Sequence, residues 1–208
     1  MYGKAIEYLK YLHALEIAAG MNFKTAFDDL YARNELPLAL GRDLCAAQRQ
    51  EMRHAAIARR MLSALGYVEL SDLMAMPAAL NAGLKASLSE PWPDGMDAYA
   101  LICFNHAMES RFADGGVQAF CANMRKFAAQ SIENIYQRSL FLDWNDELLD
   151  TVARDEGWHV ALDAYVMQIY ARIHDGFDMP GLLATKVEVT HSPFIHVIKA
   201  RQEFLRSL

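Results

Sequence analysis

Apolar residues recur at alternating spacings of three and four residues through most of this 208-residue chain. This repeat is that of one face of an α-helix, and it predicts a protein built from long amphipathic helices. The composition agrees, because Ala, Leu and Met number 68 whereas Val and Ile number 18. Val and Ile lose rotamer freedom in helices, so this balance favours an all-α fold.

Breaks in the repeat divide the chain into four main helical stretches and a short last one, which we treat as one domain covering the whole sequence. Pro37 separates the first two stretches, Gly66 ends the second, and Asp114-Gly115-Gly116 can end or kink the third. The fourth is expected to begin at an N-cap formed by Asp143 or Asn145. The predicted helices span about residues 4–32, 38–65, 97–142, 145–175 and 193–207, with one or two weaker short helices within 71–89.

Charge and composition exclude several classes of protein. The formal net charge of −6 supplies no basic face, so we expect no nucleic-acid partner. The longest uncharged stretch has 12 residues, too few to span a bilayer, and no secretory signal peptide is visible. The three cysteines, Cys45, Cys103 and Cys121, lie among apolar neighbours without a CxxC spacing. This pattern is typical of buried cysteines in a reducing compartment, so we expect a cytoplasmic protein with no membrane partner.

Acidic residues and histidines occupy positions in the apolar seams where core residues should lie. A buried carboxylate is costly unless it is paired or bound to a metal. Two seams each contain a Glu-x-x-His pair, whose members lie one above the other on a helix and can hold one metal ion with an oxygen and a nitrogen. The two other seams contribute one glutamate each. The predicted metal ligands are Glu16, Glu51, His54, Glu109, Glu156 and His159, and no catalytic residue beyond them is predicted.

Glu51-Met-Arg-His54-Ala and Asp155-Glu156-Gly-Trp-His159 resemble the two metal motifs of the ferritin-like superfamily of di-iron carboxylate proteins. The resemblance implies a ferritin-like four-helix bundle, here with additional short helices, that binds two iron ions, or manganese and iron, and uses O₂ as a co-substrate. In that superfamily the Asp before the last motif glutamate commonly hydrogen-bonds a ligand histidine, which implies such a bond between Asp155 and His54. Gln50 holds the equivalent position in the other motif.

Glu133 is an alternative to Glu109 as the ligand from the third helix. Its helical neighbours are a lysine and glutamines, which mark a solvent face, whereas the neighbours of Glu109 are apolar. This difference favours Glu109. The 47 residues between Glu109 and Glu156 exceed the usual spacing of the superfamily, so an insertion near 117–140 has to be accommodated.

Two further polar residues have more than one interpretation, and a third has one. His106 lies one turn before Glu109 and is either an extra ligand, a pocket residue or a satisfied core histidine. Asp163 follows His159 by four residues, and it either hydrogen-bonds that histidine, acts as an extra ligand or has a structural role. His13 falls off the first apolar seam and is expected at the surface.

Two irons held mainly by carboxylates bind and reduce O₂. The first hypothesis is therefore a di-iron oxygenase or oxidase that hydroxylates, N-oxygenates, desaturates or deformylates a small organic substrate. Extra length beyond a minimal four-helix subunit, and aromatic residues beside the seams, favour a substrate pocket. We expect a homodimer that takes electrons from an external donor such as a ferredoxin or reductase. The alternatives are a ferroxidase or iron-storage protein of the bacterioferritin type and a manganese catalase-like peroxidase.

Overall fold

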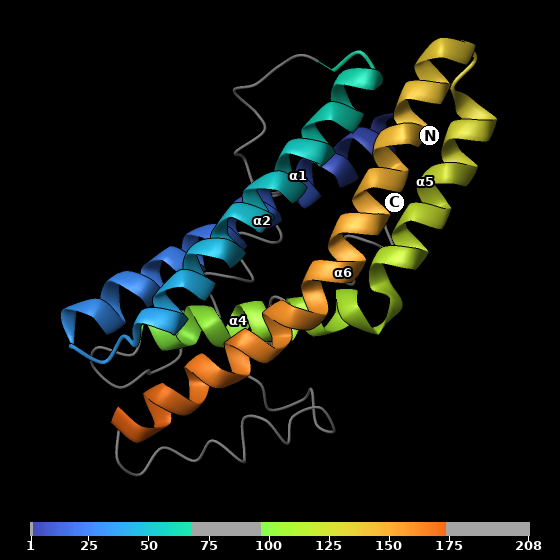
Figure 1. Cartoon of the computed structure of the whole chain (residues 1–208). Helices are drawn as coiled ribbons and strands as arrows, with labels where there is room; N and C mark the ends of the chain where they lie inside the picture. The colour runs from blue at the N-terminus through green and yellow to red at the C-terminus, as the bar shows by residue number, and fades with distance from the viewer. Residues whose placement is uncertain (1, 68–96, 174–208) are drawn as a thin grey trace.

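The computed structural model describes residues 2–67 and 97–173, and within these ranges every regular element is helical (Figure 1). The elements are α1 (Tyr2–Ala32), α2 (Leu38–Ala64), α4 (Asp97–Arg111), the π-helical turn η1 (Phe112–Gly116), α5 (Val117–Ser131) and α6 (Ile135–Ile173). The all-α prediction is confirmed for these residues, while the short helices predicted within 71–89 and at 193–207 lie outside them. No described helix has a stretch long and apolar enough to cross a membrane.

α1 and α2 form an antiparallel hairpin. The residues between them end α1 and begin α2 within a short turn. Asn34 follows α1 in the left-handed region, with φ of 58°, and the amide of Glu35 then donates to the carbonyl of Leu30 at 2.9 Å. Pro37, which cannot continue a helix, directly precedes α2. Gly66, with φ of 79°, ends α2 as predicted, since glycine tolerates this conformation without strain.

α4 and α5 together make the third long helix, with the wide turn η1 between them. Gly115 has φ of 102°, a conformation that favours glycine. A Cβ atom on Gly116 would lie 2.5 Å from the carbonyl oxygen of Arg111, so the bend also requires glycine there. The predicted break near residue 115 is confirmed, and it begins less than one turn after Glu109.

The fourth helix begins at Ile135, not near residue 145, and the third ends at Ser131, not near 142. Asn134 is the N-cap of α6, because its Oδ1 accepts the amides of Tyr136 at 3.0 Å and Gln137 at 3.1 Å. The predicted boundary between the third and fourth helices is therefore wrong.

Both predicted N-caps lie inside α6. Asp143 is exposed on its surface. Asn145 is buried, and its Nδ2 donates to the carbonyl oxygen of Cys121 on α5 at 3.3 Å. Asn145 thus joins α6 to α5 instead of starting a helix.

Four helical arms, α1, α2, α4–α5 and α6, pack side by side around the core. α1 packs against α2 and α4, and α6 packs against α2, α4 and α5. α2 and α4–α5 run in the same direction, so α2 ends and α4 begins at opposite ends of the assembly (Figure 1). The long separation between Glu109 and Glu156 is accommodated by the hairpin of α5 with the first half of α6, which extends beyond both glutamates.

Candidate metal centre

The six predicted ligands converge in the core from all four arms, and each is at most 3% exposed. They come from α1 (Glu16), α2 (Glu51 and His54), α4 (Glu109) and α6 (Glu156 and His159). Their ligand atoms form two groups, each compact enough to surround a metal ion. One group contains Glu16, Glu51, His54 and Glu156, and the other contains Glu51, Glu109 and His159. Glu51 belongs to both groups.

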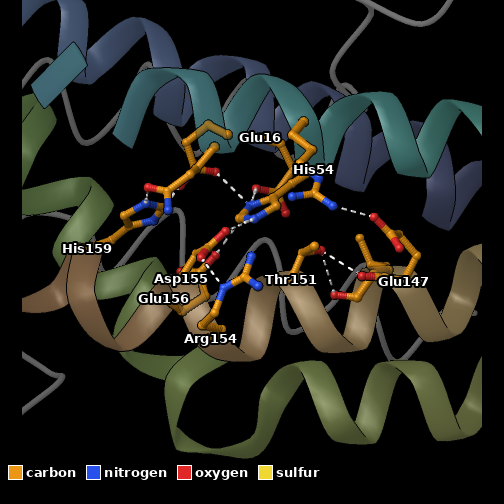
Figure 2. A network of polar contacts seen from close by, with 12 residues as sticks. Glu16, His54, Glu147, Thr151, Arg154, Asp155, Glu156 and His159 are labelled. Atoms are coloured by element: carbon orange, nitrogen blue, oxygen red, sulfur yellow. Dashed lines mark hydrogen bonds and ion pairs between the residues drawn. The ribbon is translucent and has the colours of Figure 1, made fainter. Parts of the chain in front are cut away.

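Glu51 lies between the two histidines, with one oxygen facing each. Its Oε2 is 3.4 Å from Nδ1 of His54, and its Oε1 is 2.6 Å from Nδ1 of His159. Nδ1 of His54 also lies 3.5 Å from Oε2 of Glu16 and 3.9 Å from Oε1 of Glu156. Figure 2 shows Glu16 and His54 directed toward Glu156, with His159 about one turn further along α6.

The outer nitrogen of each histidine contacts a polar side chain on the opposite helix. Nε2 of His54, on α2, lies 3.2 Å from Oδ2 of Asp155 on α6. Nε2 of His159, on α6, lies 3.1 Å from Oε1 of Gln50 on α2. When Nε2–H donates to these oxygens, the Nδ1 lone pair of each neutral ring faces the cluster, which is the tautomer that binds a metal. Asp155 also accepts a hydrogen bond from Nε of Arg154 at 2.9 Å.

Many polar atoms of the cluster lack a hydrogen-bond partner among the described residues. They include both oxygens of Glu51, both oxygens of Glu109 and Nδ1 of His54 and His159. Nδ1 of His159 and Oε1 of Glu51 approach to 2.6 Å, and both atoms are among those without a hydrogen-bond partner. Each unsatisfied buried polar group costs about 1–3 kcal/mol, and a cation between them satisfies several at once. Carboxylate oxygens with two imidazoles suit iron or manganese, so the donor set fits such a metal pair.

The peripheral glutamates hold protons when no metal is bound. Burial, followed by the charge of Glu51, raises the pKa of Glu16 to about 8. Burial, followed by the charge of Asp163, raises the pKa of Glu109 well above its ordinary value. Burial and the charge of Glu51 do the same for the pKa of Glu156.

At the centre of the cluster the pKa shifts favour charged side chains instead. Burial opposes the ionisation of Glu51, but the nearby rings of His159 and His54 outweigh it and lower the pKa of this carboxyl. Burial also disfavours the charged form of His54, but contacts with Asp155 and Glu16 outweigh it and raise its pKa to about 12. Without metal, the centre is thus a charged pair of Glu51 and His54 inside a shell of protonated glutamates, and metal binding must displace these protons.

Asp163 lies against Glu109 and not against His159. Its side chain is fully buried, and its carboxyl is within hydrogen-bonding reach of the Glu109 carboxyl. The ring nitrogens of His159 face Glu51 and Gln50 instead.

Two other candidate residues belong to neither of the two groups of potential ligands. Glu133, the alternative to Glu109, is exposed in the turn before α6. His106 is half-buried and belongs to neither of the two groups. The third-helix residue that reaches the cluster is therefore Glu109.

A pair of buried asparagines beside the cluster was not predicted. Nδ2 of Asn22 on α1 donates to Oδ1 of Asn105 on α4 at 2.7 Å, and Nδ2 of Asn105 donates to the carbonyl of Ala19 at 3.2 Å. Asn105 lies one turn before Glu109 on the same face of α4. This position beside a predicted ligand is the one feature of the sequence that could have indicated the asparagine pair. The pair joins α1 to α4 next to Glu109.

Two further features hold α1 against α2. His13 is only 7% exposed, and its Nδ1 donates to the carbonyl of Ala55 at 2.8 Å, so its expected surface position is wrong. Gly20 is buried where the helices approach beside Glu51. A Cβ atom there would lie 2.5 Å from Cε of Met52 and 3.2 Å from Cβ of Glu51.

A surface groove of about 450 Å³ lies at the turn between α1 and α2, away from the cluster. Its lining includes Phe27, Tyr31, Leu36, Pro37 and Gly41. None of the six predicted ligands lines it, so it is separate from the candidate metal centre.

No protein-family model, curated protein or solved structure matches the chain. The site is defined by its own arrangement, in which buried carboxylates from four helical arms surround two histidines and share Glu51. Such a cluster can hold metal ions.

Proposed function

We propose that this chain is a ferritin-like di-iron carboxylate protein that activates O₂ to oxidise a small organic substrate. The observation that carries the proposal is the position of Glu51, a buried glutamate shared by two groups of potential ligands. A ligand set with one glutamate from each of two helices and a Glu-x-x-His pair from each of two others is that of the ferritin-like di-iron and di-manganese proteins.

The direction of the arms supports the ferritin-like assignment. α1 and α2 form one antiparallel pair and α5 and α6 form another, while α2 and α4–α5 run in the same direction (Figure 1). This arrangement is that of bundles with one long connection between the second and third helices. The chain has residues 68–96 available for such a connection.

The proposed roles of the residues follow from their contacts. Glu51 would join the two metal positions, while Asp155 and Gln50 hold the histidine rings in the ligating tautomer. When bound, a pair of ferrous ions supplies electrons for the reduction of O₂. The burial of every ligand keeps bulk water away from the centre, which protects reactive chemistry from side reactions.

Burial also favours an oxidase or oxygenase over an iron-storage protein. Storage requires iron to enter and leave the site repeatedly, whereas ligands that are at most 3% exposed are suited to a resident metal pair. We further propose a homodimer served by an external electron donor such as a ferredoxin or reductase. Its setting is proposed to be the reducing cytoplasm, in which Cys45, Cys103 and Cys121 stay free.

Metal analysis and Mössbauer spectroscopy of protein loaded with Fe²⁺ under anaerobic conditions test the proposal. We expect about two irons per chain, as in other proteins with this ligand set, and oxidation of both when O₂ is admitted. Replacement of His54 or His159 by Ala should remove iron. A folded chain that binds no iron, or that keeps its iron after both replacements, would show that the proposal is wrong.

The size of the particle separates the two classes of function. We expect a dimer whose iron content stays at about two ions per chain when Fe²⁺ is in excess. A large shell of about 24 chains that mineralises excess Fe²⁺ would instead identify a storage protein.

A further inference from the structure

Asp163 adds a further acidic side chain to the buried cluster. It is 0% exposed, and within the described part of the chain no N–H or alcohol O–H group donates to either of its oxygens. Its carboxyl is within reach of the carboxyl of Glu109, and no N–H or alcohol O–H group of the described residues donates to the oxygens of Glu109 either. Two carboxyl groups in contact in a protein interior require either a shared proton or a shared cation.

The helical position of Asp163 directs it to the same side of α6 as the other ligands. Residues three and four apart lie on one helix face, so Glu156, His159 and Asp163 form a continuous row. This row faces α2 and α4, which supply Glu51 and Glu109. Asp163 lies at the end of the row where Glu109 is found.

The two groups of potential ligands are unequal without Asp163. The group around His54 has four residues, and the group around His159 has three. Asp163 is not a member of either group as they stand, and it adjoins the second one through its contact with Glu109. We infer that Asp163 is the fourth protein ligand of the metal position formed by Glu51, Glu109 and His159. This inference rests on the proposed di-iron function.

Ligation by Asp163 makes the two metal positions alike in formal charge, because each then has one histidine, two carboxylates of its own and a share of Glu51. The four glutamates formally balance two divalent ions, and Asp163 adds one negative charge beside Glu109 and His159. An extra anionic ligand stabilises a trivalent ion more than a divalent one. Asp163 thus brings the position near Glu109 level with the other position in its support for an oxidised metal.

Asp163→Asn separates ligation from a simple hydrogen bond between the two carboxyl groups. Asparagine keeps the size of the side chain and can donate its NH₂ group to Glu109, but it is neutral and a poor metal ligand. If Asp163 only positioned Glu109, the variant would keep two tightly bound irons. Asp150→Asn is the matched control, since Asp150 is an exposed aspartate on the same helix.

Anaerobic Fe²⁺ binding is measured by equilibrium dialysis for the wild-type chain and both variants. We expect two irons in the wild type and in Asp150→Asn, whereas Asp163→Asn keeps one and binds the second more than about tenfold more weakly. Two irons at wild-type affinity in Asp163→Asn would overturn the inference and leave the proposed function intact. A wild-type chain without iron would overturn both.

The fold of the variant is checked without metal by circular dichroism and thermal unfolding. The amide oxygen of the Asp163→Asn variant can still accept the proton of Glu109, so the replacement is not expected to destabilise the metal-free chain. If Asp163→Asn nevertheless fails to fold, Asp163→Ser undergoes the same binding measurement with the same expected loss of the second iron.

Discussion

Nε2 of His54 lies 3.2 Å from Oδ2 of Asp155, and this contact crosses from α2 to α6. The reciprocal contact joins His159 on α6 to Gln50 on α2 at 3.1 Å. In each case the partner is the residue that precedes a motif glutamate on the opposite helix. The two motifs therefore orient each other's histidines, and neither half of the site is complete without the other.

Asp155→Asn should weaken metal binding by about 10–100-fold, because an amide supports the imidazole of His54 less strongly than a carboxylate does. The measurement is a competitive Fe²⁺ titration against a chelator under anaerobic conditions. Asp150→Asn again serves as the control, with an exposed aspartate on the same helix. Equal affinities in the two variants would show that the contact between Asp155 and His54 has no part in metal binding.

Glu109→Ala should abolish tight binding of at least one metal ion and the associated reaction with O₂. The replacement removes a carboxylate beside a buried pair of cations and leaves their positive charge under-compensated. Glu133→Ala should leave metal content unchanged and alter stability by no more than about 0.5 kcal/mol, since this side chain is exposed. Metal analysis of the two variants, side by side, distinguishes them. The opposite result would show that Glu133, and not Glu109, is the metal ligand.

The cluster could be predicted from the sequence because its residues violate an otherwise regular pattern. Glu51 and His54 interrupt an apolar seam of α2, where a charged side chain is costly unless it has a buried partner. That cost makes a polar residue in a seam informative. Asn22 and Asn105 gave no comparable signal, because their hydrogen bond depends on the packing of α1 against α4 and not on local spacing.

The start of α6 could not be predicted for a different reason. Apolar residues continue at helical spacing on both sides of the break, and several residues suited to N-caps follow one another. In the structure Asn134 is the N-cap of α6, whereas Asn145 donates a hydrogen bond to α5. The choice between them depends on where α5 and α6 pack, which a local pattern does not contain.

Gly20→Ala should disturb the contact of α1 with α2 beside Glu51. Cε of Met52, 2.5 Å from the added Cβ, ends a flexible side chain and can move away. Cβ of Glu51 at 3.2 Å and the carbonyl oxygen of Gln48 at 3.3 Å are fixed to α2 and have to shift, and overpacking of this kind costs about 1 kcal/mol. Gly157→Ala is the control, since it lies inside α6 with nothing within 4 Å of its added Cβ, and it should stabilise by about 0.5–1 kcal/mol. Urea denaturation of both variants measures the difference. If Gly20→Ala is as stable as the control, the helices have room at this position.

The metal-free chain should become less stable as the pH rises from about 5 to 8. Burial, followed by the charge of Glu51, raises the pKa of Glu16 from 4.5 to about 8, so the folded chain keeps a proton that the unfolded chain has released. Stability then falls with pH by up to about 1.4 kcal/mol per unit for each such proton. The raised pKa values of Glu109 and Glu156 act in the same direction.

No shift in the centre of the cluster reverses this slope. The lowered pKa of Glu51 contributes stability that is already complete above pH 4.5, and the raised pKa of His54 contributes stability that is lost above pH 6.5. With Fe²⁺ present under anaerobic conditions the slope should change sign, because deprotonated ligands bind the metal and the protons are released. Thermal unfolding in chelator and in Fe²⁺ across this range measures both slopes. Glu16→Gln removes one titrating group, so its metal-free slope should be shallower. A metal-free chain whose stability rises toward pH 8 would contradict the assignment of buried protons to these glutamates.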